Sequence, residues 1–269
     1  FFKYCNFELN DNACALASEE TDATFIGCYF TNNKNYSIDV SQSTARLIGC
    51  KIKENKQIGL SALNSSTVEL TDCILSANED NGAQIGMKAN VSMKNCRIEG
   101  HENKSGIFID NAKLECNGCI FENNNETHIK SKSQSTVTVT DCEFLETEKG
   151  IAMQFVEGAD ILIKNCKISD QKEVGIISAG SSSIKIENTT IKNGETMGIC
   201  MQKGSSFTIT DCEISDIEKT GIFIAGSNGK IENCFISNCG KYGIYVNSGN
   251  VENSGCRYLN NGGDFHEGN

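Results

Sequence analysis

A cysteine recurs every 22 to 24 residues along this chain, and it stands in the same local context each time. Residues 135–178 show two copies, in which V-x-V-x-D-C-x-F-…-G-I-x-M around Cys142 is followed by I-x-I-x-N-C-x-I-…-G-I-x-S around Cys166. A period this short is typical of repeat proteins, whose copies bury their apolar side chains by stacking on each other. Thr189 fills the one place that lacks the cysteine, so the chain holds twelve copies. The repeating cysteines are Cys5, Cys28, Cys50, Cys73, Cys96, Cys119, Cys142, Cys166, Cys212, Cys234 and Cys256.

Each copy contains two short apolar patterns with a period of two, which is typical of β-strands. The residue two places after the repeat position is large and apolar or aromatic in every copy, as Phe144 and Ile168 are. Three and five places before it come apolar pairs such as Ile161 and Ile163. The residue directly before it is Gly, Asn or Asp in every copy except the first, which has Tyr4. Because these three residue types tolerate a left-handed backbone, we expect a bend there between two strands.

A third short strand is predicted after a recurring glycine. Gly221 is followed by Ile222 and Ile224, and most other copies have apolar residues in the same two places. Three short strands without a helical stretch between them do not form a β-α-β unit. We therefore predict an all-β fold, a single-stranded parallel β-helix of about twelve coils of 22–24 residues with three short strands per coil. Successive coils should stack about 4.8 Å apart.

The repeating cysteines are expected to form an inward column, because Cys is small and commonly buried. Metal binding is the alternative, but the column lacks the paired C-x₂-C spacing of zinc sites. Cys116 and Cys119 form the single C-x₂-C pair, and both fall at inward positions of their strands. The sequence therefore predicts a structural role for these thiols, with no metal and no cofactor.

Composition bears on the compartment and on the class of partner. Fifteen cysteines favour a reducing compartment, because stacked thiols would form scrambled disulfides in an oxidising one. We predict a cytoplasmic protein, with secretion as the alternative because sequons begin at Asn90 and Asn125. The acidic net charge of −11 disfavours nucleic acid as a partner. No signal peptide and no membrane-spanning run of apolar residues is recognised, so we predict no membrane partner.

The unbroken repeat predicts one β-helix domain over residues 1–269. The chain starts without Met and in the middle of the pattern, since Cys5 and Phe7 already belong to a coil. An uncovered coil is an exposed sheet edge, and proteins usually cover such edges. We therefore expect a fragment of a longer chain, whose missing flanks would supply the caps.

The consensus C-x-[IF]-x-x-N-x₃-G-I-x-[IV], which residues 73–85 and 234–246 follow with substitutions, resembles the right-handed parallel β-helix repeat superfamily. That superfamily has the pectate-lyase-like fold. It includes pectate lyases, polygalacturonases, alginate epimerases, periplasmic copper-accessory proteins and the β-helix of certain F-box ubiquitin-ligase receptors. The resemblance covers nearly the whole chain and implies right-handed coiling. In character the chain is closest to the non-enzymatic β-helix domains of F-box-type receptors. Such a fold by itself says little about function.

The catalytic motifs of polygalacturonases and of pectate lyases are incomplete in this sequence. A polygalacturonase-like site has an adjacent Asp pair, which is absent, and an Arg-x-Lys, which does not accompany Gly100-His101. Pectate lyases use an Arg base, and the three arginines of this chain lie far apart in sequence. Asp39 and Asp110 are expected three coils apart, or about 14 Å, which is too far for paired carboxylates of a glycosidase. Trp, the usual sugar platform, is absent. We therefore predict no catalytic residue, although enzymatic activity stays open.

One outward-facing column departs from an ordinary soluble surface. It is predicted two places after the glycine of the third strand, and its C-terminal half is apolar. A stacked apolar stripe is unusual on an exposed surface, so either a loop or flanking segment covers it or it contacts a partner. Its members are Leu16, Asp39, Ser61, Gln84, Phe108, Lys130, Ala152, Ile177, Cys200, Phe223 and Tyr245.

These observations favour a non-enzymatic protein-interaction or structural scaffold within a larger assembly. The predicted contact residues for a protein partner are Phe108, Ile177, Cys200, Phe223 and Tyr245, and Cys200 is expected to be the most reactive thiol unless something covers it. The alternative is a polysaccharide-active enzyme (lyase, hydrolase or epimerase) or a carbohydrate-binding β-helix. An ice-binding surface is a third hypothesis, suggested by Thr-x-Thr pieces such as that beginning at Thr208.

Overall fold

A computed structural model describes residues 1–147 and 150–268. Its contacts divide the chain into two compact units, unit 1 from Phe1 to Lys130 and unit 2 from Ser131 onward, and each is described by itself. The described residues form strands and no helix, which confirms the all-β prediction. The strands fall into three series that repeat in chain order, three strands to a coil, as a parallel β-helix requires.

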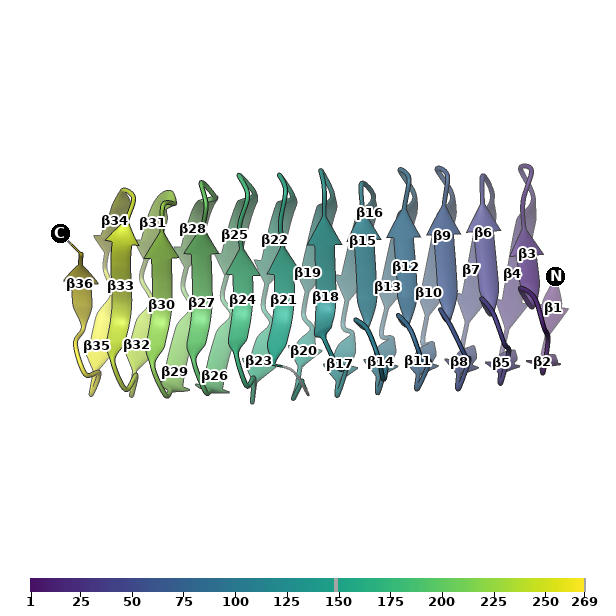
Figure 1. The fold of residues 1–269 in the computed structure, drawn as a ribbon, viewed down its shortest axis with the longest axis horizontal. Helices are drawn as coiled ribbons and strands as arrows, with labels where there is room; N and C mark the ends of the chain where they lie inside the picture. The colour runs from purple at the N-terminus through teal and green to yellow at the C-terminus, as the bar shows by residue number, and fades with distance from the viewer. Residues whose placement is uncertain (148–149, 269) are drawn as a thin grey trace. The chain divides into compact units, whose positions relative to one another are not determined.

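In unit 1 each series forms a parallel sheet whose strands follow every third position in the chain (Figure 1). The first sheet contains β1 (Phe2–Lys3), β4 (Asp22–Ile26), β7 (Thr44–Ile48), β10 (Thr67–Thr71), β13 (Asn90–Lys94) and β16 (Lys113–Asn117). The second contains β2 (Asn6–Glu8), β5 (Tyr29–Thr31), β8 (Lys51–Lys53), β11 (Ile74–Ser76), β14 (Arg97–Glu99) and β17 (Ile120–Glu122). The third contains β3 (Ala15–Ala17), β6 (Ile38–Ser41), β9 (Leu60–Leu63), β12 (Ala83–Gly86) and β15 (Ile107–Asp110). The strand β18 (Thr127–Lys132) crosses the division between the units.

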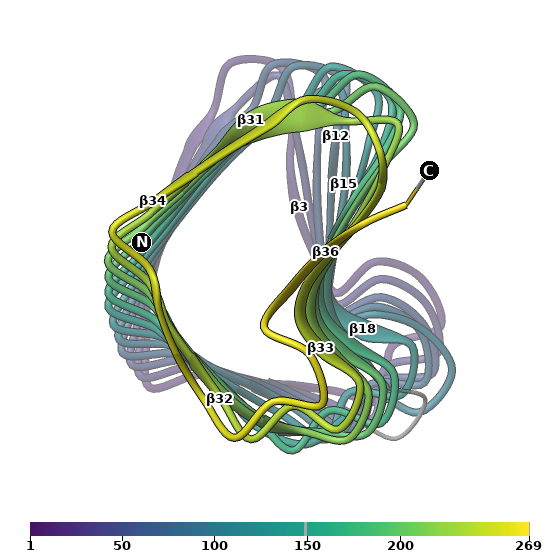
Figure 2. The same ribbon diagram turned by 90° about the vertical axis from the view of Figure 1, so that its left-hand side faces the viewer.

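Unit 2 is built in the same way, and Figure 2 shows β31, β32 and β33 on three sides of one coil. Its first sheet contains β19 (Thr136–Thr140), β22 (Asp160–Lys164), β25 (Ser183–Glu187), β28 (Ser206–Thr210), β31 (Asn228–Glu232) and β34 (Val251–Ser254). The second contains β20 (Glu143–Phe144), β23 (Lys167–Ser169), β26 (Thr190–Gly194), β29 (Glu213–Ile217), β32 (Phe235–Ser237) and β35 (Arg257–Leu259). The third contains β21 (Ile151–Phe155), β24 (Val174–Ser178), β27 (Met197–Gln202), β30 (Thr220–Ala225), β33 (Tyr242–Ser248) and β36 (Phe265–Glu267).

The bend before each repeat position has the left-handed backbone that the sequence predicts. Asp72 has a φ of 53°, Asn165 of 54° and Gly27 of 59°. Tyr4, the one residue there that is not Gly, Asn or Asp, also has a φ of 53°. The fold therefore imposes this conformation at the bend even where the residue type does not favour it.

The interior of each unit is a stack of apolar side chains in register. In unit 2, Phe144 pairs with Ile168, Ile168 with Ile191, and Ile191 with Ile214, and all four are at most 2% exposed. The predicted stacking of this column is confirmed. Cys166 and Cys212 are also buried, and each thiol lies within hydrogen-bonding distance of a backbone carbonyl of its own coil.

A buried line of polar side chains, the polar ladder, runs through unit 1 five places after the repeat position. The backbone and side-chain N–H groups of Asn33 donate to Asn55 Oδ1 at 3.0 Å each, and those of Asn55 donate to Asn78 Oδ1 at 3.2 and 2.8 Å. The backbone N–H of Asn78 donates to His101 Nδ1 at 3.2 Å. His101 N–H in turn donates to Asn124 Oδ1 at 3.5 Å. The Asn of the consensus thus ties each coil to the next, because a buried amide must be hydrogen-bonded.

His101 replaces an asparagine in the polar ladder and is almost wholly buried. Among the residues that the structure describes, its Nε2 has no hydrogen-bond partner, whereas its Nδ1 accepts from the backbone N–H of Asn78. Burial lowers the pKa of His101 to about 4, because the charged imidazolium would lose its hydration there. The side chain is therefore neutral at physiological pH.

Candidate functional site

The outward column of the third sheet in unit 2 holds four of the five predicted contact residues. Ile177 pairs with Cys200, Cys200 with Phe223, and Phe223 with Tyr245, on successive strands of one sheet. The register continues from Tyr245 to His266 on β36. Figure 1 shows β24, β27, β30 and β33 side by side and pointing in the same direction. The structure therefore brings these side chains onto one face, as the spacing predicts.

The predicted column contains one error of register, at Ala152. Ala152 is wholly buried, and Gln154 is the residue that pairs with Ile177. Ile151 pairs with Val174, so Ala152 stands in the place that Gly175 has on the next coil. A small alanine takes the place of the recurring glycine here, and Gly150 lies two places too early to mark the strand. The sequence signal was misleading because it relied on the glycine alone.

Four rings gather at one end of this face and form what we call the ring cluster: Phe223, Tyr242, Tyr245 and His266. The centroids of Phe223 and Tyr245 are 5.6 Å apart, and those of Tyr242 and Tyr245 are 5.2 Å apart. His266 lies 5.0 Å from Tyr242 and 5.3 Å from Tyr245. Separations of this size are those at which aromatic rings attract each other. The four rings come from β30, β33 and β36, and the planes of neighbouring rings are inclined to each other by 20° to 51°.

Gly263 allows the ring of Tyr242 to lie close to the backbone. A Cβ atom at position 263 would come within 2.9 Å of Tyr242 Cδ1 and 3.1 Å of Cε1. Such contacts are too short, so any other residue would displace the ring or shift the backbone. Tyr242 and His266 were missed in the sequence because Tyr242 precedes the glycine and His266 lies in the irregular tail. The strand pairing of His266 with Tyr245 was hidden because the residue in register with Gly243 is not a glycine.

The ring cluster is edged by polar groups. The hydroxyl of Tyr245 donates to Asn247 Oδ1 at 3.5 Å. The side-chain amide of Gln202 donates to Cys200 Sγ at 3.0 Å. Both groups can exchange these contacts for hydrogen bonds to a bound molecule, because amides and phenols both donate and accept.

Cys200 is not an exposed thiol, which corrects the expected reactivity. It is 0% exposed although it lies on the outward column, because the larger Ile177 and Phe223 on the neighbouring strands cover it. Burial raises the pKa of the Cys200 thiol to about 11, and the thiolate is the reactive form. Cys200 therefore contributes packing to this face and no nucleophile.

Phe108, the fifth predicted contact residue, belongs to unit 1. The outward column there runs in register from Leu16 through Asp39, Ser61 and Gln84 to Phe108. Lys130, at the end of unit 1, is half-buried, and its Nζ lies 3.5 Å from Glu126 Oε2. The side chain of Phe108 lines a separate hollow of about 280 Å³ in unit 1.

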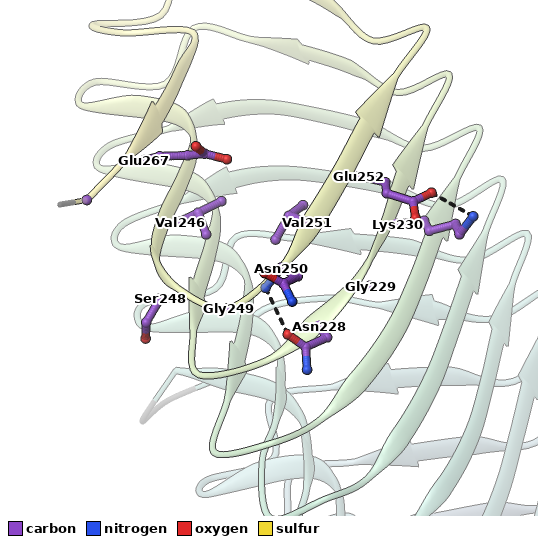
Figure 3. Close-up of a pocket in the computed structure, with 11 residues that line it drawn as sticks. Asn228, Gly229, Lys230, Val246, Ser248, Gly249, Asn250, Val251, Glu252 and Glu267 are labelled. Carbon is purple, nitrogen blue, oxygen red and sulfur yellow. Dashed lines mark hydrogen bonds and ion pairs between the residues drawn. The ribbon is translucent and has the colours of Figure 1, made fainter.

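A larger hollow of about 490 Å³ lies in unit 2 between the ends of β33 and the starts of β31 and β34. Figure 3 shows Lys230 and Glu252 reaching toward each other at its edge, where their charged atoms are 2.7 Å apart. The backbone N–H of Asn250 donates to Asn228 Oδ1 at 2.8 Å. Several of the polar groups that line this hollow are thus already paired with each other, which makes it a weaker candidate than the ring cluster.

The described residues contain no group of three or more His, Cys, Asp or Glu side chains placed to hold a metal ion. No carboxylate is a member of the ring cluster, so the paired acids of a glycosidase are not part of it. In the part of the chain that the structure describes, no helix is long and apolar enough to cross a membrane.

The sequence matches the family model described as the right handed beta helix region, over residues 1–144 and 127–267. The chain belongs to this family. The two matches together span nearly all of the sequence, and membership supports the right-handed coiling that the repeat resemblance implies. No curated protein matches this β-helix chain at a significant level.

Several solved structures share the fold of this β-helix protein at low sequence identity. The periplasmic alginate epimerase AlgG has a TM-score of 0.62 at 9% identity, covering 97% of this chain and 76% of that one. The A-module of the mannuronan C-5 epimerase AlgE4 from Azotobacter vinelandii has a TM-score of 0.57 at 13% identity, with coverages of 91% and 88%. The catalytic domain of a GH87 α-1,3-glucanase in complex with nigerose has a TM-score of 0.54 at 10% identity, with coverages of 100% and 63%. At such identities the likeness establishes the fold alone.

These comparisons contradict the prediction of a non-enzymatic scaffold, which is therefore wrong. The three similar structures are enzymes that act on polysaccharides, as their names state, and they favour the alternative over the scaffold. The sequence argument relied on two enzyme motifs and on the lack of Trp. It left out that tyrosine, phenylalanine and histidine rings can supply a flat binding surface when tertiary structure gathers them.

Proposed function

We propose that this chain is a polysaccharide-binding β-helix protein and that the ring cluster of unit 2 is its contact surface. The observation that carries the proposal is the contact of Tyr242 and Tyr245 with each other and with His266. The C–H faces of sugar rings pack against aromatic rings, and their hydroxyl groups need polar neighbours. The ring cluster offers the first, and the amides of Gln202 and Asn247 at its edge offer the second.

The geometry of a β-helix suits a polymer of sugars. Successive coils are about 4.8 Å apart, which is close to the length of one sugar unit in an extended chain. The rings of Phe223 and Tyr245 lie on adjacent strands, so neighbouring sugars of one chain can contact successive coils. The strands are already ordered, so binding costs little backbone entropy. The polysaccharide-acting enzymes that share this fold support the same class of partner.

Modification of the bound polysaccharide is the second candidate function. It is favoured by one observation, the stacking of the Tyr242 ring on the His266 imidazole at 5.0 Å. Histidine and tyrosine are side chains that take up and release protons in catalysis. Proton abstraction from a sugar carbon, as in a lyase or an epimerase, is the reaction class to which this pair is suited.

We propose that the protein works outside the cytoplasm, which replaces the cytoplasmic prediction by its alternative. One of the enzymes that share the fold is periplasmic, and polysaccharides are largely extracellular polymers. The cysteine argument against secretion is weakened by burial. Cys73, Cys166 and Cys234 are about 1% exposed, and inaccessible thiols are slow to oxidise.

The proposal is tested by affinity electrophoresis of the full chain through gels that contain alginate, polygalacturonate, an α-glucan or a β-glucan. We expect retardation by at least one polymer, and a roughly tenfold weaker affinity for the Phe223→Ala, Tyr245→Ala double variant. Tyr29→Ala is the matched control, because Tyr29 is an exposed ring on the second sheet of unit 1. Equal retardation of the wild type and the double variant would reject the ring cluster as the binding surface. Release of unsaturated or epimerised sugars from a retained polymer would establish the second function.

A further inference from the structure

A hollow of about 280 Å³ lies on the outer side of the third sheet in unit 1, over β9, β12 and β15. Its volume is just below the roughly 300–1,000 Å³ typical of sites for drug-sized molecules. It can therefore hold a molecule of about one ring. Its lining residues are Leu63, Gln84, Ile85, Gly86, Met87, Phe108, Asp110 and Asn111.

Gly86 forms the floor of the hollow. It pairs with Asp110, and a Cβ atom at this position would lie 3.2 Å from Leu63 Cδ2 and 3.5 Å from the Asp110 carbonyl oxygen. Gly86 does not have a positive φ, so the backbone would accept another residue here. A Cβ atom here would be in tight contact with Leu63, so a larger residue would displace that side chain and fill part of the hollow. The lack of a side chain at Gly86 therefore keeps the floor of the hollow low.

The walls of the hollow differ in chemistry. Phe108, half-buried on β15, supplies a ring, and Met87 supplies an apolar side chain that is 59% exposed. Gln84 pairs with Phe108 across the two strands, which places its amide next to the ring. Asp110 lies two places further along the strand, on the same face. One molecule in the hollow can therefore touch a ring, an amide and a carboxylate together.

The polar groups of the hollow are unused by the protein. Within residues 1–147 and 150–268, the side chains of Gln84, Asp110 and Asn111 form no hydrogen bond or ion pair. Acidic residues on the neighbouring faces are paired, as Glu115 is with Lys113 at 2.6 Å. Three unpaired polar side chains around one hollow therefore supply both acceptors and donors for a ligand.

We propose that this hollow binds one uncharged sugar ring. A pyranose has an apolar C–H face that can pack on Phe108, and neighbouring hydroxyl groups that can donate to the Asp110 carboxylate. Gln84 and Asn111 can donate to and accept from further hydroxyls. A purely apolar ligand is disfavoured because it would remove the Asp110 charge from water without a hydrogen bond in return.

The same carboxylate excludes acidic sugars. Among the described residues that line the hollow there is no lysine or arginine to balance the charge of Asp110. The carboxylate of a uronic acid would therefore meet a like charge at close range, and the chain as a whole carries a net charge of −11. The site thus selects neutral hexoses over uronates. It shares no residue with the ring cluster, so its test stands apart from that of the proposed function.

The test titrates the full chain with methyl glycosides of glucose, mannose and galactose, and with glucuronate, galacturonate and glucosamine, by NMR or calorimetry. We expect millimolar binding of at least one neutral glycoside and no measurable binding of either uronate. Phe108→Ala should weaken the neutral glycoside roughly tenfold through loss of the ring contact. Asp110→Asn should also weaken binding of the neutral glycoside, and it should reduce the ratio of the affinity for the neutral glycoside to the affinity for the uronate. Circular dichroism and thermal unfolding confirm that each variant stays folded.

Asp72→Asn is the matched control, because Asp72 occupies a bend where other coils have Asn, as at Asn95. It should leave both affinities unchanged. Uronate binding as tight as that of the neutral glycosides would overturn the proposal, and so would an unchanged ratio in Asp110→Asn. Binding of glucosamine alone would show a cation site in place of a sugar site and would also overturn it. Failure of every neutral glycoside to bind would do the same, whatever the outcome for the ring cluster.

Discussion

The ring of Tyr242 lies nearly parallel to the imidazole of His266, with centroids 5.0 Å apart and planes inclined by 20°. The two residues come from β33 and β36, neighbouring strands of one parallel sheet. Tyr242 is not the strand partner of His266, because Tyr245 occupies that position. The contact therefore depends on the way the Tyr242 side chain leans along the sheet, and Gly263 provides the space for it.

Replacing Gly263 with alanine should disrupt this contact. The added Cβ would come 2.9 Å from Tyr242 Cδ1, so the ring must turn away from His266. We expect polysaccharide affinity to fall roughly threefold to tenfold, since one aromatic contact contributes about 0.5–1.5 kcal/mol. Affinity electrophoresis measures the change, and Ser206→Ala, an exposed position on the first sheet, is the control. If Gly263→Ala and the wild type have the same affinity for a polymer that the wild type binds, the position of Tyr242 is irrelevant to binding.

Stability should fall on acidification because of His101. Its pKa is lowered from 6.5 to about 4 in the folded protein, so the unfolded chain binds the proton first as pH falls. The contribution of His101 to the free energy of unfolding is therefore fully retained above a pH of about 6.5. Between a pH of about 6.5 and about 4 this contribution is lost progressively, and the total loss is about 3 kcal/mol. Urea unfolding at a series of pH values measures this loss.

His101→Asn is the informative variant for that experiment. Asparagine fills the same place of the polar ladder at Asn55 and Asn78, where its side chain bonds to the next coil. The variant should fold and should lose less stability between pH 6.5 and 4 than the wild type. If the two proteins show the same acid dependence, other groups control it and the buried imidazole does not.

The rate at which each thiol is labelled should depend on its burial, and a position on the outward column should not by itself make a cysteine react faster. Cys5, Cys14 and Cys256 are half-exposed, and they should react before Cys200, which is fully buried. All fifteen cysteines should react after denaturation without a reductant. Mass spectrometry of the time course identifies the order. Rapid labelling of Cys200 would mean that Ile177 and Phe223 do not cover it in solution, and stacked disulfides would leave fewer than fifteen reactive thiols.

Truncation of the interior column should be costly. Phe144 is wholly buried and stacks on Ile168 of the next coil. Replacing Phe144 with alanine should lower the free energy of unfolding by roughly 3–5 kcal/mol through the cavity it leaves. Because coils depend on their neighbours, exchange protection should fall first around β20 and β23. Chemical denaturation and hydrogen exchange measure the two effects, and a loss below about 1 kcal/mol would contradict tight packing at this position.

The sequence determined the repeat and therefore the fold. The period of the repeat position, the residues at the bend and the apolar places flanking it indicated three parallel strands in each coil, because period two and a left-handed bend are local properties of the chain. It also indicated the line Ile177–Cys200–Phe223–Tyr245, since strand pairing in a parallel β-helix follows directly from the repeat spacing. The same logic failed at Ala152, where the glycine that marks the strand is displaced.

Tertiary structure alone decided which of these side chains can meet a ligand. The sequence placed Cys200 on the outward column and left open whether something covers it, and the structure shows it buried, because exposure depends on the sizes of side chains on adjacent coils. Tyr242 and His266 meet because Gly263 leaves room for a ring to lean along the sheet, and this is a contact between side chains that no period encodes. The hollow around Gly86 likewise depends on tertiary structure, because side chains of neighbouring strands surround a position that has no side chain. A repeat specifies where backbones stack, whereas a binding surface is formed by the differences between its copies.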